Sequence, residues 1–373
     1  MTTRSRLVLP AISLLTFLLT FSSMCRSEQS DHLKPNQEIE DLTRALSGHW
    51  SLAVNWESDA SSPKGSVLSG EETWRPGPGG YTLIEEETLQ MREQPLFLLG
   101  ILWWDSASKT LKGMECQNLL PYTCDIKGAR GDIAMKWDDK QLVIDETETS
   151  ETGRKSTWHE VWSDITPTSF VQTGEYGQPG APRKKLFTIH ATRLPDSKSK
   201  ETAGTVPSEA QSAPESAPQL QSLTQSLAGH WTTSYVFGDG KTGAGEEIWR
   251  PGPGGYVLME EEHIKSSSTE VFLIAFHWWD KTTNSLRGML CNNSGPAACN
   301  LDTYSNSTLN WDGKQLTIDL QFPEHGKKML WHEIWSDISP TSFTQTGDAG
   351  EMGGPAKRAV TIHGSKVQQH DPS

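Results

Sequence analysis

Residues Trp74 to Tyr81 read WRPGPGGY, and the same residues recur without change from Trp249 to Tyr256. Further matched stretches lie on both sides of this motif: LSGHW ending at Trp50 and LAGHW ending at Trp231, and WHEVWSDI starting at Trp158 and WHEIWSDI starting at Trp331. The spacing between matched residues changes only between motifs, where loops are expected. Self-similarity over such a distance is the signature of an internal repeat. The chain is therefore a tandem duplication of one domain.

Within each copy, apolar and polar residues alternate in short runs that are bounded by Gly, Pro, Asp and Ser, a pattern typical of β-strands. In the first copy we expect strands at Gly80 to Leu89, Leu96 to Asp105, Gln141 to Glu146, Ser156 to Ser163, Ser169 to Gly174 and Lys185 to Ala191. The intervening PGPGG stretch is expected to form a hairpin turn. Many short strands joined in sequence predict an all-β domain of about nine to ten strands, an up-and-down barrel or a sandwich, and closure into a barrel removes exposed edges.

Each copy also begins with a short helical stretch that is followed by Gly-x-Trp, at Gly48-His-Trp50 and Gly229-His-Trp231. This combination resembles the lipocalin and wider calycin superfamily. The Glu-Glu-x-Trp run before Trp74, repeated before Trp249, resembles uncharacterised bacterial lipocalin-like families of unassigned activity. The resemblance implies two tandem antiparallel β-barrels, and it implies little about function because a fold hosts many functions.

The same resemblance implies how each barrel closes. In lipocalins an Arg from the last strand stacks on the Trp of the Gly-x-Trp motif. Arg193 and Lys366 stand at the matching ends of the last expected strands and are candidates to cover Trp50 and Trp231 by cation–π contact. Lys366 departs from the Arg pattern, so closure is expected to differ in the second copy.

The composition suggests the domain boundaries. We expect an export signal at 1–25, a polar leader at 26–40, a first barrel at 41–193, a linker at 194–222, a second barrel at 223–366 and a tail at 367–373. The linker range is rich in Pro, Ser, Ala, Glu and Gln, which predicts a flexible, disordered connection. We therefore expect the two domains to be tethered rather than packed together.

The N-terminus has the order of an export signal, with Arg4 and Arg6 before an apolar run from Leu7 to Phe21 and small residues after it. That run is shorter than the roughly 20 residues that span a bilayer, and no later stretch is long and apolar enough for a transmembrane segment. The expected location is secreted or periplasmic. Cys25 follows the run and is a candidate for a lipid anchor, although Met24 before it is larger than lipid attachment normally accepts; the alternative is cleavage nearby.

The other four cysteines form two matched pairs, Cys116 with Cys124 and Cys291 with Cys299. An exported chain meets an oxidising compartment, so we expect one local disulfide per domain. Metal binding is the weaker interpretation, because two thiols per domain without neighbouring His residues are too few ligands. No metal site is expected.

The formal net charge is −14, and Lys and Arg do not cluster. Such a chain repels phosphate backbones, which argues against nucleic-acid or anionic-membrane partners.

The Trp residues suggest a binding site. Fourteen of the fifteen Trp residues pair across the copies, and only Trp56 has no counterpart. The leading hypothesis is a small apolar or amphipathic ligand held in each barrel. The wall would be contributed by Trp74, Trp104, Trp158 and Trp162, and by Trp249, Trp279, Trp331 and Trp335.

On the strand from Trp158, the period of two places Trp158, Glu160 and Trp162 on one face and His159 on the other. The pattern does not reveal which face is inside. An inward Glu160, or Glu333 in the second copy, would need a partner such as Arg75 or Arg250, or would have a raised pKa. An inward His159 or His332 would meet a ligand.

Two alternatives use these residues. One is a haem or other cofactor held by His159 and His332, or by His190 and His363. The other is an enzyme in which Glu160 or Glu333 works with a histidine such as His49 as acid and base. No nucleophile motif or phosphate loop is present, which favours a binding protein over an enzyme. The runs Glu85 to Glu87 and Glu260 to Glu262 are expected to be solvated strand ends.

Overall fold

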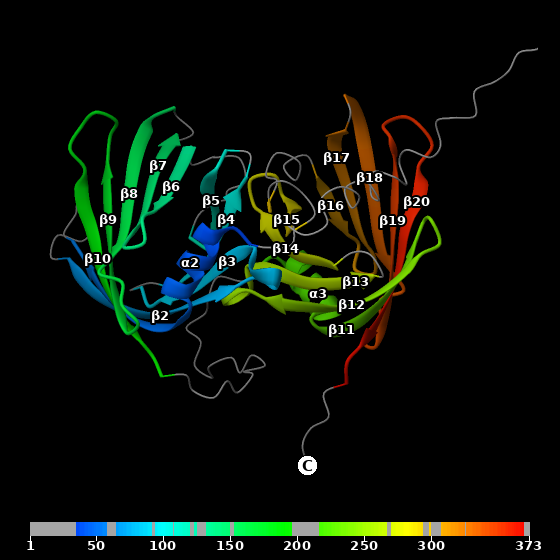
Figure 1. Ribbon diagram of the computed structural model, residues 1–373, viewed down its shortest axis with the longest axis horizontal. Coiled ribbons are helices and arrows are strands. Elements are labelled where there is room, and N and C mark those ends of the chain that lie inside the picture. The colour runs from blue at the N-terminus through cyan, green and yellow to red at the C-terminus, as the bar shows by residue number, and fades with distance from the viewer. Residues whose placement is uncertain are drawn as a thin grey trace, which may run out of the picture.

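Alternating apolar residues produce two closed barrels in the computed structural model, which describes residues 35–57, 65–91, 94–106, 108–119, 123–124, 132–149, 153–195, 216–266, 270–293, 298–299, 307–324 and 326–368. Each barrel has ten antiparallel strands, and each strand pairs with its neighbours in sequence until the last pairs with the first (Figure 1). The all-β tandem architecture expected from the sequence is confirmed.

The first barrel contains β1 (Gly48–Trp56), β2 (Ser66–Pro76), β3 (Thr82–Leu89), β4 (Leu96–Asp105), β5 (Thr110–Gln117), β6 (Asp132–Trp137), β7 (Leu142–Thr149), β8 (Lys155–Ser163), β9 (Ser169–Gly177) and β10 (Lys184–Arg193). The second contains β11 (Gly229–Phe237), β12 (Thr242–Pro251), β13 (Val257–Ser266), β14 (Glu270–Asp280), β15 (Ser285–Asn292), β16 (Thr308–Trp311), β17 (Leu316–Glu324), β18 (Lys327–Ser336), β19 (Ser342–Glu351) and β20 (Lys357–Lys366).

A short helix precedes each barrel, as the sequence suggested. Helix α2 (Gln37–Leu46) is capped by the Asn36 side chain, which accepts a hydrogen bond from the Glu38 amide. Its buried residues are Ile39, Leu42 and Leu46, a spacing that forms one apolar stripe. Helix α3 (Pro218–Leu227) buries the equivalent leucines and starts inside the range expected for the linker. Neither of these described helices is long and apolar enough to cross a membrane.

The helix end of each barrel is closed by the expected cation–π contact. The Arg193 guanidinium lies 4.1 Å from the centroid of the Trp50 ring and donates a hydrogen bond to the Ser47 carbonyl. In the second barrel Lys366 Nζ lies 4.9 Å from the Trp231 ring and donates to the carbonyl of Ala228. Lys therefore replaces Arg with the same geometry but with a single charged centre.

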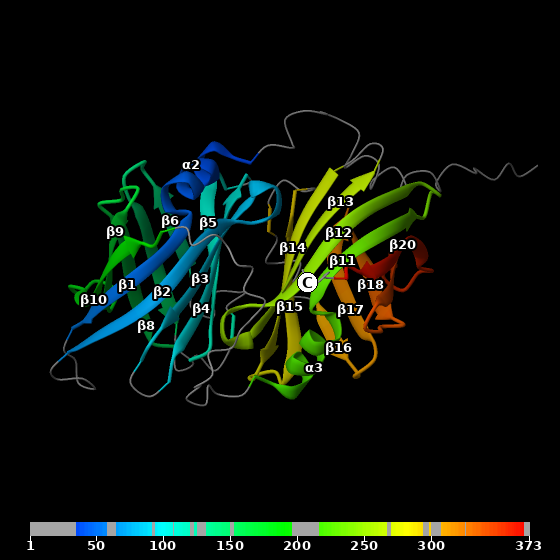
Figure 2. The same cartoon turned by 90° about the horizontal axis from the view of Figure 1, so that it is seen from below.

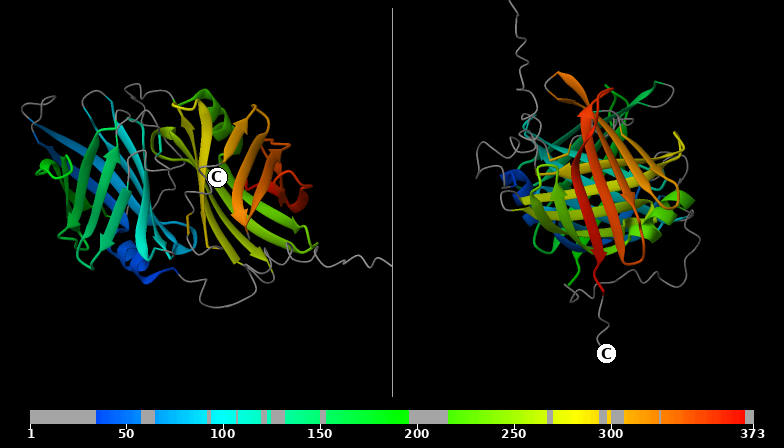
Figure 3. Two further views of the ribbon diagram at one scale, coloured as in Figure 1. Left: turned by 90° about the horizontal axis from the view of Figure 1, so that it is seen from above. Right: turned by 90° about the vertical axis from the view of Figure 1, so that its right-hand side faces the viewer.

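The two barrels pack against each other, which corrects the expectation that they are only tethered (Figure 2). One buried apolar cluster draws from the outer faces of β3 to β5 and β13 to β15: Ile84, Leu99, Ile101, Trp103, Met114, Val257, Met259, Ile274, Phe276, Trp278 and Met289. Viewed from above, these strands meet between the barrels (Figure 3). The linker composition gave no sign of this contact, because the residues that make it lie in the strands.

Contacts across the interface come in reciprocal pairs. Arg75 donates to Glu261 with Nη2 to Oε1 at 2.5 Å, and Arg250 donates to Glu86 at the same distance. Tyr81 faces Phe272, and Tyr256 faces Phe97. Equivalent residues exchange partners, as in an isologous dimer interface related by a two-fold axis. Each copy therefore occupies the place that a second subunit would take.

The turn in the invariant motif belongs to this interface. Gly79 has φ 65° and Gly254 has φ 63°, conformations that glycine adopts without strain. A Cβ at Gly79 would clash with Phe272, and one at Gly254 with Phe97. The WRPGPGGY motif thus supplies an Arg, a tight turn and a Tyr to the contact between the barrels, which explains its exact recurrence.

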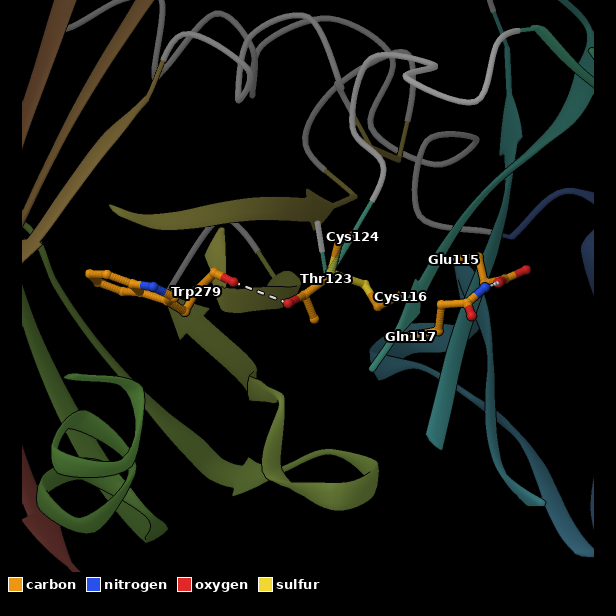
Figure 4. Close-up of a disulfide and its surroundings, with 6 residues drawn as sticks. All are labelled: Glu115, Cys116, Gln117, Thr123, Cys124 and Trp279. Carbon is orange, nitrogen blue, oxygen red and sulfur yellow. Dashed lines mark hydrogen bonds between the residues drawn. A yellow bond between two sulfur atoms is a disulfide. The ribbon is translucent and has the colours of Figure 1, made fainter. Parts of the chain in front are cut away.

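Both disulfides are formed, Cys116 with Cys124 and Cys291 with Cys299, and all four cysteines belong to the interface cluster. Beside the first, Thr123 donates from Oγ1 to the carbonyl of Trp279 in the other barrel at 3.0 Å (Figure 4). The disulfides therefore fix loops that contact the neighbouring barrel. Disulfides such as these form in oxidising compartments.

Reversing two interface charges tests the reciprocal packing. In Arg75→Glu/Arg250→Glu, four carboxylates would meet in a largely buried site, and we expect the free energy of unfolding to fall by about 3–5 kcal/mol. Calorimetry should then resolve two barrel transitions in place of one. Adding Glu86→Arg/Glu261→Arg restores the alternation of charge and should recover most of the loss. Failure of this rescue would contradict the assigned pairing.

Candidate functional site

The register of each barrel decides which side chains face its lumen. Trp50 pairs with Glu72, Glu72 with Glu87, and Trp74 with Glu85, so these residues share one face of the sheet. Trp50 is fully buried. The Trp158, Glu160 and Trp162 face of β8 also points inward, since its partners on β7 and β9 are core residues such as Leu142 and Gln172.

All eight Trp residues proposed for a ligand wall lie on inner faces by this register. Trp103 and Trp278, next in sequence to two of them, face the neighbouring barrel instead. Trp158 and Trp331 are only half-buried. Their role toward a ligand stays a proposal.

The Glu runs on β3 and β13 are not solvated strand ends, which corrects the sequence expectation. Glu85 and Glu87 point into the lumen with exposed fractions of 8% and 7%, while Glu86 between them reaches the interface. Glu260 and Glu262 repeat this arrangement in the second barrel. Neither face of β3 or β13 is an open outer surface, because one face lines the lumen and the other packs against the neighbouring barrel.

Four glutamates therefore occupy equivalent inner positions in both copies: Glu72, Glu85, Glu87 and Glu160 in the first, and Glu247, Glu260, Glu262 and Glu333 in the second. The first barrel has two further inner-face acids, Glu115 and Glu146. The residues at the equivalent positions of the second barrel are Leu290 and Leu320. Among the described residues, the buried acidic and basic side chains are glutamates and His277, and none is Lys or Arg.

Glu160 and Glu333 are held by the same two donors. The Trp158 indole donates to Glu160 at 2.5 Å and the Gln172 amide at 3.4 Å. Trp331 donates to Glu333 at 2.6 Å and Gln345 at 2.5 Å. Arg75 and Arg250, which the sequence suggested as partners, face the interface instead.

The other acids are partnered differently in the two barrels. In the second, Trp249 donates to Glu247, Tyr235 donates to Glu262, and His277 Nε2 lies 3.4 Å from Glu260. In the first, neither oxygen of Glu72 and no nitrogen of the Trp74 ring has a hydrogen-bond partner among the described residues.

Burial shifts the pKa values of the titratable side chains that face the lumens. Burial, with the charges of Glu115 and Glu160, raises the pKa of Glu87 to about 8. Burial raises the pKa of Glu262 to about 7, although the hydrogen bond from Tyr235 lowers it. The pKa values of Glu72 and Glu85 are also raised well above 4.5 by burial and then by neighbouring carboxyls. Burial lowers the pKa of His277 to about 4, so this histidine is neutral near pH 7.

An aromatic cluster lies above the acids of the first barrel, at the end opposite α2. The ring centroids of Trp158 lie 6.0 Å from Tyr176 and 6.1 Å from Phe187, and Trp56 stacks on Phe187 at 5.6 Å. The first barrel thus has an aromatic layer over an acidic layer, an arrangement that suits a molecule with both apolar and polar parts.

The repeated histidines lie outside the lumens. His159 Nδ1 is 2.9 Å from Asp145, and His332 Nδ1 is 2.6 Å from Asp319, both on the outer face. His49 pairs with Glu71 on the outside, and His190 and His363 are exposed. The sheet separates them from Glu160 and Glu333, so the structure does not bring together the acid–base pair or the inward histidine ligands considered from the sequence.

No set of three or more His, Cys, Asp or Glu side chains in the described ranges is grouped as ligands for one metal ion. The export signal, Cys25 and most of the linker lie outside the described residues.

Sequence reasoning missed Glu72, Glu85, Glu87 and His277 as lumen residues. The sequence of β3 does contain a sign of this placement, because the alternation of side chains puts Glu85 and Glu87 on the same face as the apolar Leu83 and Leu89. Only the pairing of that strand on both sides reveals that this face is enclosed.

No family model matches the chain, and a search of curated proteins finds no relative. Solved structures with a similar fold include a redesigned β-barrel, mFAP1, bound to DFHBI, at 17% identity, covering 38% of this chain and 97% of that one with a TM-score of 0.23. A protein of unknown function from the DUF3598 family of Nostoc punctiforme matches at 10% identity over 89% of this chain and all of its own, with a TM-score of 0.24. The structure itself defines the class as a tandem pair of closed antiparallel barrels, and the function has to be argued from the lumens.

The raised pKa values make stability depend on pH. The unfolded chain gives up its glutamate protons near pH 4.5, while Glu87 and Glu262 hold theirs to about pH 8 and 7. Between these limits the folded state binds more protons, so the free energy of unfolding should fall as pH rises, by up to about 1.4 kcal/mol per pH unit for each group.

Urea denaturation from pH 4.5 to 8.5 measures this slope. Glu87→Gln/Glu262→Gln should flatten it, whereas the control Glu40→Gln, at an exposed position of α2, should leave it unchanged. Stability that rises across this window would contradict the enclosed, protonated carboxyls.

Proposed function

We propose that each barrel is a binding module that holds a small amphipathic molecule in its lumen, and that the protein works in an oxidising compartment outside the cytoplasm. The observation that carries this proposal is the layered lumen of the first barrel, in which half-buried Trp158 and Trp56 stand over enclosed carboxyls. Sites for small molecules are commonly apolar walls with a few converging polar groups.

The half-buried state of the inner residues supports an accessible lumen. Ile144, Trp158 and Glu160 all face inward, yet none is fully buried. Aromatic side chains offer large contact areas with little conformational entropy to lose, so they suit the apolar part of a ligand. The Glu160 carboxylate, oriented by Trp158 and Gln172, is a fixed polar group for the other part.

Binding of a neutral apolar fluorophore, N-phenyl-1-naphthylamine, tests the proposal. We expect saturable enhancement of its emission, and we expect Trp158→Ala/Trp331→Ala to weaken binding about tenfold or more, because each substitution removes a large part of the lumen wall.

The matched control is His159→Ala/His332→Ala, which changes the neighbouring residue on the outer face of the same strands. It should bind the fluorophore as the parent does. Equal losses of fluorophore affinity in both variants would indicate a site outside the lumen. An absence of saturable binding would contradict the proposed function.

A further inference from the structure

We propose that the lumen of the first barrel selects an organic cation, an amine or ammonium group carried on an apolar body, and that the second lumen does not share this preference. This inference rests on the proposed function and names the ligand class of the same site.

The first argument is the set of inner charges. The first barrel places Glu72, Glu85, Glu87, Glu115, Glu146 and Glu160 on inner-face positions of β2, β3, β5, β7 and β8. Lys and Arg do not occur among the buried side chains that the structure describes. Buried carboxyls such as those of Glu72, Glu85 and Glu87 either hold protons or attract a positive group. The electrostatic complement of this lumen is a cation.

The second argument is a pair of unsatisfied groups. Glu72 is 1% exposed and Trp74 is 2% exposed, and both face the lumen. Both Glu72 oxygens and Trp74 Nε1 lack partners within the described chain. Buried polar atoms in native proteins are nearly always hydrogen-bonded, so such a group calls for an explanation. The N–H groups of an ammonium ion beside Glu72 would supply donors for its two oxygens.

The second barrel provides the contrast, because there the equivalent groups meet. Trp249 donates to Glu247, and Tyr235, which stands at the register position of Val54, donates to Glu262. His277 takes the position of Leu102 and lies beside Glu260. All four shared acids, Glu333 included, thus have partners from within the barrel. The two additional acids of the first barrel are leucines here.

The third argument is the aromatic layer of the first barrel. Trp56, the one Trp without a counterpart, joins Trp158, Tyr176 and Phe187 at the end opposite α2. Aromatic faces attract cations as well as apolar groups, and the attraction grows when water is excluded. A ligand with its apolar body among these rings would direct its charged head toward Glu160 and Glu72.

Protonation supports the same ligand class. Burial and then neighbouring carboxyls raise the pKa values of Glu72, Glu85 and Glu87, and that of Glu87 reaches about 8, so this carboxyl holds its proton near neutral pH. A cation favours the ionised carboxylates and displaces these protons.

The test compares three ligands with the same chain length on the full-length protein at pH 7.5: decylammonium (protonated n-decylamine), 1-decanol and decanoate, each used below its micelle concentration. Displacement of N-phenyl-1-naphthylamine gives their affinities. We expect the ammonium ion to bind at least about tenfold more tightly than decanol, and decanoate to bind most weakly.

The variants locate the site. Glu72→Gln should weaken binding of the ammonium ion about tenfold and leave decanol within about twofold. Glu247→Gln, the same change in the other copy, and Glu71→Gln, its outward neighbour, should retain binding of the ammonium ion. Glu160→Gln is a second lumen variant, expected to behave as Glu72→Gln does.

Each outcome decides a separate point. Equal affinities for the ammonium ion and decanol would overturn the cation preference while leaving the lumen as a binding site. Equal losses in Glu72→Gln and Glu247→Gln would overturn its assignment to the first barrel. Failure of all three ligands to displace a bound fluorophore would overturn the cation inference, whereas failure of the fluorophore itself to bind would remove the proposed function.

Discussion

Closure of each sheet on itself is the constraint on which the rest of the structure depends. In a closed barrel every second side chain enters one lumen, and no strand has a free edge. On β3 this alternation divides three consecutive glutamates, sending Glu85 and Glu87 inward and Glu86 outward. The same residue type therefore meets two environments within one strand. Burial alone would raise the pKa of Glu86, but Arg250 and Arg75 outweigh it and lower that pKa.

The outer face of the same strands explains why the copies stay together. A duplicated domain carries the same surface twice, and a surface that complements itself can then close within one chain. Arg75 and Arg250, the two PGPGG turns and the two disulfides all serve this contact. The interface thus accounts for the recurrence of the WRPGPGGY motif in both copies, independent of what the lumens bind. Meanwhile the lumens have diverged, since Glu115 and Glu146 are replaced by leucine and Leu102 by His277.

Much of this architecture follows from the sequence. Duplication, strand periodicity, the Gly-x-Trp motif and paired cysteines led to two barrels and two disulfides, because each signal is local. The alternation of side chains along a strand also places Trp158, Glu160 and Trp162 correctly on one face. It does not say which face is enclosed, and Glu85 and Glu87 were assigned to solvent because charged residues are rarely buried without partners. Likewise, Trp103 and Trp104 look equivalent in sequence, yet one faces the second barrel and the other the lumen.

The central claim is that the first lumen holds protons on its buried carboxyls and gives them up when it binds a cation. Calorimetric titration with decylammonium at pH 7, in two buffers of different ionisation enthalpy, measures this exchange directly. We expect net proton release on binding, reduced in Glu72→Gln. Binding with no proton exchange, or with proton uptake, would contradict the account.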